Sequence, residues 1–238
     1  MTPPQGLRVS GLRASYRGRQ VLRGLDLQVA PGEFVVLLGA NGSGKSTALR
    51  CIAGLHSPDG GRVDGLGHRP AMVFQRPSLV GRRTVLDNVC AGALGRLSLR
   101  RSLVFPDDER WQAMTRLHRV GLAERATDRA RRLSGGQQQR VAIARALQQV
   151  AGQPEPVLLA DEPVSALDPT ASEHVLALLA DLAHGERLPV LAVLHQPDLA
   201  RRYADRVIGL RDGVAAFAGS PSEVTFDMID ALYAENAA

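Results

Sequence analysis

The sequence predicts an α/β fold in which a mostly parallel sheet is covered by helices on both faces. Three apolar runs, at 33–38, 157–160 and 189–194, are short and unbroken, which is typical of strands buried on both sides. Stretches with helical periodicity lie between these runs and after them. Strands that alternate with helices favour a parallel sheet, because the crossover helices must pack against its faces.

The first third of the chain is expected to supply two strands and a helix. Alternating apolar residues over 25–29 indicate a half-buried strand that ends at the turn 31–32. The buried run 33–38 follows, and a glycine-rich turn then leads into a helix over about 45–53.

Helical periodicity dominates the rest of the chain. The stretch 76–132 contains no convincing strand and is rich in Arg, so we expect a helical lobe inserted into the α/β core. The expected helices cover 107–120, 137–149, 170–184 and 226–235.

Composition excludes several classes of protein. The chain has 238 residues, of which 45% are hydrophobic and 22% charged, so it is neither disordered, collagen-like nor a disulfide-rich mini-protein. Two cysteines, Cys51 and Cys90, make no disulfide framework and favour a reduced, intracellular protein. The first residues do not resemble a signal peptide, and no apolar window approaches the roughly 18 residues that cross a bilayer.

Basic charge is concentrated in the expected helical lobe. The net charge of +5 comes from 29 basic and 24 acidic residues, and the only lysine is Lys45. Residues 76–132 hold 13 Arg and six acidic residues, so this stretch carries +7 and the remainder −2. The stretch is either a solvated face or a surface for an acidic partner or anionic headgroups. Nucleic acid is disfavoured because only Phe105 and Trp111 are present to stack on bases.

The run GANGSGKST at 39–47 matches the phosphate-binding pattern G-x-x-x-x-G-K-[ST]. A buried strand precedes it and a helix follows it, as the pattern requires. Glycines allow backbone N–H groups to converge on phosphates, and the helix N-terminus adds partial positive charge. Lys45 is expected at the β- and γ-phosphates and Ser46 at Mg²⁺. The sequence therefore predicts a P-loop NTPase core that binds a nucleotide.

Two carboxylates end the apolar run VLLADE at 157–162. Asp161 is placed to hold Mg²⁺, and Glu162 to orient and polarise the attacking water. The pair could alternatively cap the following turn, but its place after a P-loop favours the catalytic interpretation.

The run LSGGQQQRVAIARAL at 133–147 predicts a second phosphate site. Ser134 can cap an amphipathic helix, and Gly135 and Gly136 leave N–H groups open to an anion. An ordinary serine cap is the alternative interpretation. One nucleotide cannot use both this site and the P-loop of the same chain.

With these motifs in this order, the chain resembles the ATPase subunit of an ABC transporter from about residue 7 to 217. The resemblance implies a P-loop NTPase core with an N-terminal antiparallel β region and an inserted helical subdomain. It also implies a head-to-tail homodimer in which each ATP, with Mg²⁺, lies between the P-loop of one subunit and Ser134–Gln137 of the other. The implied core is 1–75 with 157–238, and the helical and signature subdomain is 76–156.

The resemblance also implies further roles for single residues. Tyr16 should stack on adenine, or it is simply an aromatic residue at a strand edge. Gln75 should touch Mg²⁺ and the attacking water, Asp168 should communicate across the dimer, and His195 should contact the γ-phosphate. Together with Lys45 and Glu162, Gln75 and His195 form the expected catalytic set. The other expected nucleotide contacts are Gly39, Asn41, Gly42, Ser43, Gly44, Lys45, Ser46, Thr47, Ser134, Gly135, Gly136 and Gln137; the expected metal ligands are Ser46, Gln75 and Asp161.

Several stretches are similar to the ATPase of phosphonate importers. They are 73–96, 133–147, 159–169 and 194–213. Importers of phosphate, phosphite or amino acids share parts of these stretches. The segment 150–156 is longer than usual, and 105–110 matches only loosely.

Phosphonate import implies transmembrane permease subunits, an indirect periplasmic or extracellular binding protein, and a cytoplasmic location on the inner face of the membrane. Two competing interpretations are a soluble ABC ATPase acting on DNA or the ribosome, and a P-loop small-molecule kinase. The first usually has two ATPase domains or a long coiled-coil insertion. The run LSGGQQQRVAIARAL at 133–147, the signature of the ABC family, disfavours the kinase. No nucleic-acid partner is expected.

Overall fold

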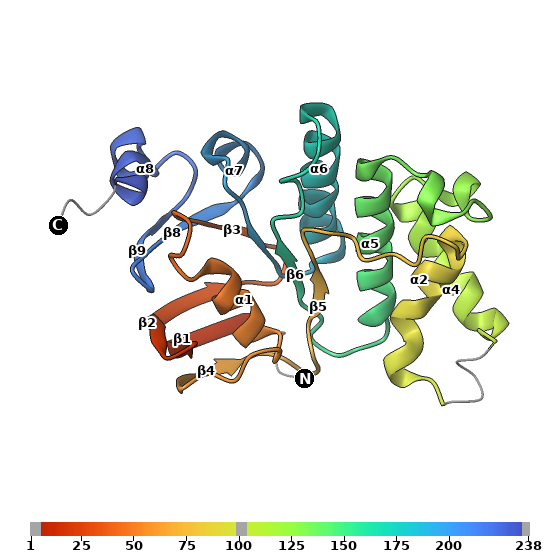
Figure 1. Ribbon diagram of the computed structural model, residues 1–238, viewed down its shortest axis with the longest axis horizontal. Helices are drawn as coiled ribbons and strands as arrows, with labels where there is room; N and C mark the ends of the chain where they lie inside the picture. Colours follow the sequence, from red (N-terminus) through yellow and green to blue (C-terminus); the bar gives the residue numbers. More distant parts are fainter. Residues whose placement is uncertain (1–5, 99–103, 235–238) are drawn as a thin grey trace.

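A computed structural model describes residues 6–98 and 104–234. Its centre is a six-stranded sheet in the order β5-β6-β7-β3-β8-β9, in which only β9 runs antiparallel within the described residues (Figure 1). The strands are β3 (Phe34–Leu38), β5 (Ala71–Val73), β6 (Leu158–Asp161), β7 (Val190–Val193), β8 (Arg206–Arg211) and β9 (Val214–Gly219).

A second, three-stranded sheet is antiparallel throughout. Its order is β2-β1-β4, with β1 at Leu7–Tyr16, β2 at Arg19–Val29 and β4 at Gly60–Asp64. The expected N-terminal antiparallel region is thus confirmed. Irregular pairing interrupts β1 at several points, and irregularities of this kind increase the local twist of a strand.

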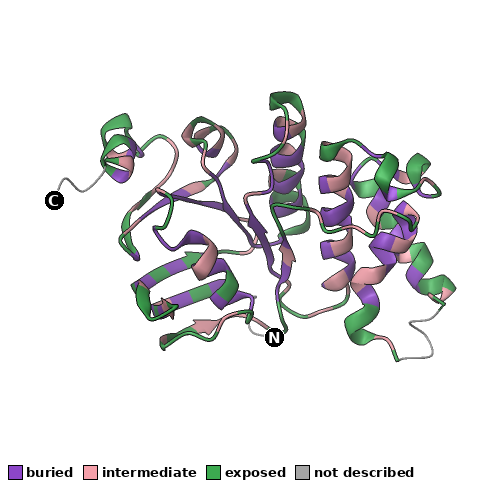
Figure 2. Cartoon of the chain, in the orientation of Figure 1, coloured by how far each residue is buried: buried purple, intermediate pink, exposed green. Residues whose placement is uncertain are grey.

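Alternating side chains of β3 contribute to two hydrophobic cores. Val35 and Leu37 pack with α1 (Lys45–Ile52) and the antiparallel sheet, whereas Val36 and Leu38 face the other layer. That other layer is formed by α5 (Gly135–Gln149), α6 (Pro169–Glu186) and α7 (Pro197–Tyr203). Figure 2 shows the central strands buried along their lengths, as the unbroken apolar runs predict. Helices cover both faces of the parallel sheet, and the antiparallel sheet adds to one of them.

The expected helical lobe forms one end of the molecule (Figure 1). Helices α2 (Val85–Cys90) and α4 (Asp107–Arg119) pack against α5, with short 3₁₀ turns at Ala91–Arg96, Ala123–Arg125 and Ala130–Arg132. Inside the lobe, buried Glu109 accepts hydrogen bonds from Arg96 Nη2 at 2.6 Å and Gln148 Nε2 at 2.7 Å. The ion pair joins α4 to the 3₁₀ turn at Ala91–Arg96, and the hydrogen bond from Gln148 joins α4 to α5.

The buried runs and the long helices lie where the sequence places them, although their ends shift by up to two residues. The last helix, α8, is described over Phe226–Tyr233, and residue 235 of the expected helix lies outside the described residues. The prediction missed β1, β4, β5, β8, β9, α2 and α7.

These missed elements are short or only partly buried. β9 contains three alanines and is mostly exposed, so neither propensity nor burial marks it as a strand. Its hairpin with β8 does carry a local signal: Asp212 and Gly213 form the turn with φ of 49° and 80°.

No helix in 6–98 or 104–234 is both long enough and apolar enough to span a bilayer.

Candidate functional site

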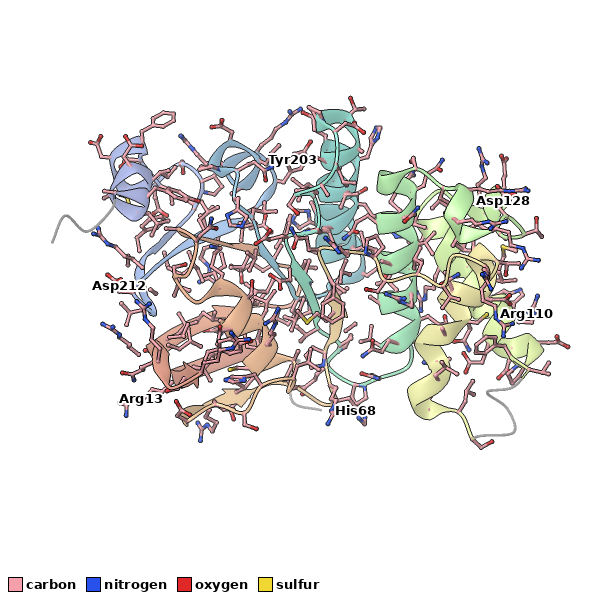
Figure 3. All side chains as sticks on the ribbon, viewed as in Figure 1. Arg13, His68, Arg110, Asp128, Tyr203 and Asp212 are labelled. Carbon is pink, nitrogen blue, oxygen red and sulfur yellow. The ribbon has the colours of Figure 1, made fainter. Side chains whose placement is uncertain are left out.

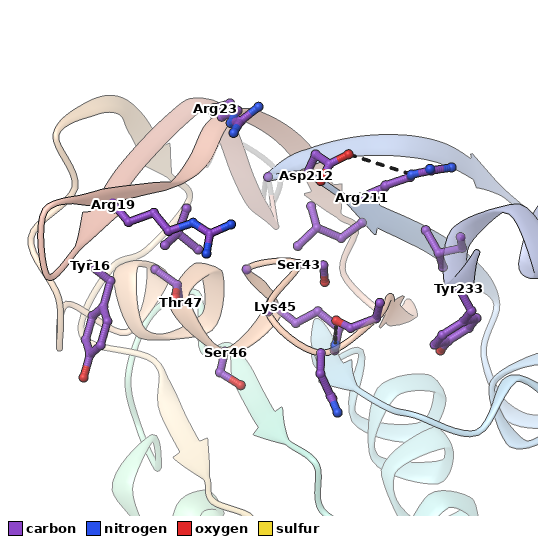
Figure 4. Close-up of a pocket in the computed structure, with 18 of the residues that line it drawn as sticks. Tyr16, Arg19, Arg23, Ser43, Lys45, Ser46, Thr47, Arg211, Asp212 and Tyr233 are labelled. Carbon is purple, nitrogen blue, oxygen red and sulfur yellow. Dashed lines mark hydrogen bonds and ion pairs between the residues drawn. The ribbon is translucent and has the colours of Figure 1, made fainter. Parts of the chain in front are cut away.

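An open cleft of about 610 Å³ lies where α1 begins, between β2, the end of β8 and α8 (Figure 4). The P-loop forms its floor. Most of the residues that the sequence assigns to the nucleotide line it, including Tyr16, Asn41, Gly42, Ser43, Gly44, Lys45, Ser46, Thr47, Glu162 and His195. The structure thus brings together side chains that are up to 179 positions apart.

The backbone of the P-loop requires glycine at two positions. Gly44 has φ of 108°, and a Cβ there would lie 2.8 Å from Leu22 Cδ2. A Cβ on Gly39 would lie 2.4 Å from the carbonyl oxygen of Leu210. Both glycines therefore permit the close packing that the loop needs.

The Ser43 side chain points into the same loop and is buried. Its Oγ has no hydrogen-bond partner among the described residues. A buried, unpaired hydroxyl costs free energy, and a phosphate oxygen in the cradle would satisfy it. This orphaned donor fits a bound phosphate.

Lys45, at the start of α1, holds its ammonium group against the loop. Its Nζ donates to the carbonyl oxygens of Gly39 at 2.7 Å and Ala40 at 2.9 Å. Burial lowers the pKa of Lys45, whereas the charges of Glu162 and Asp161 oppose that shift. An ammonium has three N–H donors, so one donor remains for a phosphate.

Asp161 ends β6 beside the helix that carries Ser46. The Ser46 hydroxyl donates to Asp161 Oδ1 at 2.9 Å. Burial raises the pKa of Asp161, and the hydrogen bond from Ser46 opposes this shift. These are oxygen ligands of the kind that Mg²⁺ takes from proteins, with phosphate and water completing the shell. The pair fits the predicted metal site.

Glu162 and His195 form the second polar pair of the cleft. His195 Nε2 lies 2.6 Å from Glu162 Oε1, so the histidine, from the loop after β7, fixes the orientation of the carboxylate. Glu162 has φ of 51°, a conformation that is uncommon for residues other than glycine. Its backbone N–H donates to Val193 O at 3.2 Å, which holds the bend in place. Strained backbone of this kind concentrates at functional sites.

Gln75 follows β5 and does not line the cleft. Its Nε2 donates to Ser165 Oγ at 3.0 Å, and that hydroxyl donates to the carbonyl oxygen of Glu162 at 3.2 Å. Gln139 of α5 donates to Phe74 O at 3.1 Å. Gln75 is thus hydrogen-bonded through Ser165 to the backbone of Glu162, and its neighbour Phe74 is hydrogen-bonded to α5, so the segment after β5 joins the two.

The signature residues Ser134–Gln137 lie at the start of α5 and do not line the cleft. Ser134 Oγ accepts from Gln137 N at 3.3 Å, and Gln137 Oε1 accepts from Ser134 N at 3.0 Å. This capping box leaves the N–H groups of Gly135 and Gly136 without an acceptor inside the helix. The serine cap is therefore present, and it leaves these two N–H groups available to an anion.

Two glycines allow the signature to pack closely against the start of α6. A Cβ on Gly136 would lie 2.8 Å from Ala171 Cβ. Asp168 caps α6, since its Oδ1 accepts from Ala171 N at 2.8 Å. The signature and Asp168 thus form one surface, separate from the cleft of the same chain.

Tyr16 ends β1 at one side of the cleft, with 46% of its surface exposed (Figure 4). It is both a strand-edge aromatic and a cleft residue. Sequence reasoning missed Arg19, Arg23 and Tyr233, which also line the cleft. Arg19 and Arg23 follow the turn after Tyr16, and this proximity was the only available signal. Nothing local marks Tyr233, because only the fold carries α8 to the P-loop.

Comparison with known proteins agrees with this arrangement. A family model described as ABC transporter matches residues 22–165. This chain belongs to the ABC transporter family. It is similar to the phosphonates import ATP-binding protein PhnC of Stutzerimonas stutzeri, with 43% identity covering 95% of this chain and 89% of the relative. The protein of the same name from Frankia casuarinae is 48% identical, covering 87% of each chain.

Solved ABC structures share the fold. The cbiO1 protein of Clostridium perfringens, part of an ABC transporter complex, has a TM-score of 0.80 at 27% identity, covering 95% of this chain and 93% of that one. A dimeric ATP-binding cassette bound to ADP and inorganic phosphate has a TM-score of 0.73 at 30% identity, covering 90% and 98%. ABC ATP-binding proteins bind and hydrolyse ATP, and this ABC protein is such an ATPase.

Proposed function

We propose that this chain is the ATP-hydrolysing subunit of an importer for phosphonates or a closely related oxyanion. The observation that carries the ATPase part is the convergence of the P-loop, Glu162 and His195 on one cleft, with Asp161 hydrogen-bonded to Ser46 of the P-loop. The cargo rests on the relatives, which are phosphonate import proteins and match along most of both chains. No cargo contact is expected in the ATPase itself.

Mg²⁺ is the metal proposed for this cleft, with Ser46 and Asp161 as its protein ligands; Gln75, the third expected ligand, does not line the cleft and donates to Ser165 instead. When bound, it would neutralise charge on the β- and γ-phosphate oxygens. The hydrogen bond between Ser46 and Asp161 preorganises both oxygens beside the start of α1. Lys45 would donate to the same phosphates with the N–H that its hydrogen bonds to Gly39 and Ala40 leave free.

Glu162 is proposed to orient the attacking water and to receive its proton. The hydrogen bond from His195 prevents the carboxylate from turning away, and a fixed orientation favours in-line attack. His195 lines the cleft, so its ring is also placed to contact the γ-phosphate. The P-loop nitrogens stabilise the negative charge that the transferred phosphoryl group carries.

The signature is proposed to act on the nucleotide of a second copy of this chain. It presents the open N–H groups of Gly135 and Gly136, yet it lies outside the cleft of its own chain. A head-to-tail homodimer would bring it to the γ-phosphate of the partner subunit, with Asp168 at the contact. ATP can drive closure of this dimer only if the contact between the signature and the γ-phosphate differs between the ATP-bound and ADP-bound states.

The helical lobe is proposed to face the permease subunits, which would hold the chain at the cytoplasmic side of the membrane. Its +7 charge, set against −2 elsewhere, suits a docking surface for an acidic partner or for anionic headgroups. An extracellular or periplasmic binding protein would act through the permease. Retention on DNA resin that falls steeply with salt would instead favour the nucleic-acid alternative.

Deleting the gene and measuring uptake of radiolabelled methylphosphonate tests the cargo. We expect phosphonate uptake to be lost and to return with the wild-type chain but not with Lys45→Ala. Phosphate, phosphite and amino-acid uptake, measured in the same strains, should be unchanged. Loss of one of these in place of phosphonate uptake would contradict the proposed cargo while leaving the ATPase assignment intact.

A further inference from the structure

The C-terminal helix α8 forms a wall of the nucleotide cleft although it carries none of the recognised motifs. Leu232, Tyr233 and Ala234 line the cleft together with the P-loop. In Figure 4, Tyr16 and Tyr233 lie at opposite sides of the cleft, with Lys45 between them. Tyr233 therefore lies beside the P-loop, on the side of the cleft away from Tyr16, the residue expected at adenine.

Several contacts fix α8 in this position. Ile229 and Leu232 are the buried residues of this helix, and Thr225 caps its first turn by accepting a hydrogen bond from Met228 N at 3.3 Å. Arg211 of β8 donates to the carbonyl oxygen of Ala231 at 2.7 Å, which ties the last turn of the helix to the sheet. The Tyr233 ring is thus held at the cleft by a fixed backbone.

The hydroxyl group of Tyr233 is shielded from solvent, and its own hydrogen has no acceptor among the described residues. Burial raises the pKa of the Tyr233 phenol, and a hydrogen bond from the backbone of Gly39 to the phenol oxygen opposes that shift. The group is therefore a neutral O–H donor next to the first glycine of the P-loop.

Gly39 is the point at which three polar side chains meet. Lys45 Nζ donates to its carbonyl oxygen at 2.7 Å. A Cβ on Gly39 would lie 2.7 Å from the unpaired Ser43 Oγ, and the Tyr233 phenol borders the same residue. Neither hydroxyl has an acceptor for its own hydrogen among the described residues. Buried hydroxyls usually have a partner, so the missing one is expected from a ligand or the water it orders.

We propose that Tyr233 is a nucleotide-binding residue whose hydroxyl donates a hydrogen bond to the phosphates held by the P-loop, directly or through one water. This extends the nucleotide site beyond the sequence motifs to the C-terminal helix. The inference rests on the phosphates occupying the P-loop of this cleft, as the proposed function requires.

The test is Tyr233→Phe, which removes the hydroxyl and keeps the ring. Tyr203→Phe is the matched control, because Tyr203 lies on α7, packs against the core and does not line the cleft. Affinity for ATP and for inorganic pyrophosphate is measured by displacement of a fluorescent ATP analogue, and Tm is measured for each protein. Pyrophosphate reports on the phosphate side of the cleft alone.

We expect Tyr233→Phe to weaken the affinity for ATP and for pyrophosphate by the same factor, about 2- to 10-fold, without lowering Tm, and we expect no effect of Tyr203→Phe on either affinity. Equal affinities in Tyr233→Phe and wild type would overturn the inference, and so would a loss for ATP alone, which would place the residue at the base or ribose. If wild type failed to bind pyrophosphate and ATP, or if Lys45→Ala bound both normally, the P-loop assignment itself would fail instead.

Discussion

Replacing Glu162 with Gln removes one negative charge from the cleft and changes little else. The side chain keeps its length, and glutamine adopts the φ of 51° as readily as glutamate. The amide can still pair with His195 Nε2, which lies 2.6 Å from Oε1 in the wild type. What disappears is the basic oxygen that receives the proton of the attacking water.

The size of the effect follows from that single loss. A positioned general base contributes about 10²- to 10⁴-fold to a rate. The expected rise in activation free energy is therefore about 2.7–5.5 kcal/mol. ATP binding should survive, because the P-loop, Ser46 and Asp161 are untouched and repulsion between Glu162 and the phosphates is removed. The variant should accumulate as an ATP-bound dimer.

The assay measures phosphate release and, by gel filtration with ATP, the dimer. Glu155→Gln is the matched control: Glu155 also has a positive φ, of 50°, but it is exposed and does not line the nucleotide cleft. We expect wild-type rates for the control. Hydrolysis by Glu162→Gln within about threefold of wild type would refute the role of this carboxylate, as would loss of ATP binding in a folded variant.

Three further predictions concern buried groups. Burial raises the pKa of Asp161 above its ordinary value of 3.8. The charged carboxylate therefore lowers the free energy of unfolding at pH values above the raised pKa, and this destabilisation is absent below pH 3.8. Asp161→Asn should therefore raise Tm at pH 7 by about 2–4 °C while abolishing Mg²⁺-dependent hydrolysis; a lower Tm would contradict this. Glu109→Ala should lower the free energy of unfolding, measured in urea, by about 2–3 kcal/mol. This is less than for a fully buried pair because the Arg96 side chain is 32% exposed. A decrease below about 0.5 kcal/mol, the size expected of a surface substitution, would show that the pair is dispensable. Burial raises the pKa of Cys51 and of Cys90 to about 11. Both thiols should therefore react with Ellman's reagent at pH 8 only after the protein unfolds. Rapid labelling of the native protein would refute the packing of α1 and α2.

Local physics explains which elements the sequence reveals. The runs 33–38, 157–160 and 189–194 are unbroken because strands in the middle of a parallel sheet are buried on both faces. The cap at Ser134 is recognisable because its partner, Gln137, is only three residues away. β5 has only three residues, and its position depends on pairing with β6, which is distant in sequence. β9 is exposed, so only the turn that joins it to β8 marks it locally.

By itself, the sequence determined the P-loop, the carboxylate pair, the signature and the order of the main layers, because each of these is encoded in neighbouring residues. Only the tertiary structure placed His195 against Glu162, linked Gln75 to Ser165 and brought Tyr233 to the P-loop. These contacts join residues 33 to more than 190 positions apart. No local pattern encodes them, since they form only when separate strands align at the same edge of the sheet.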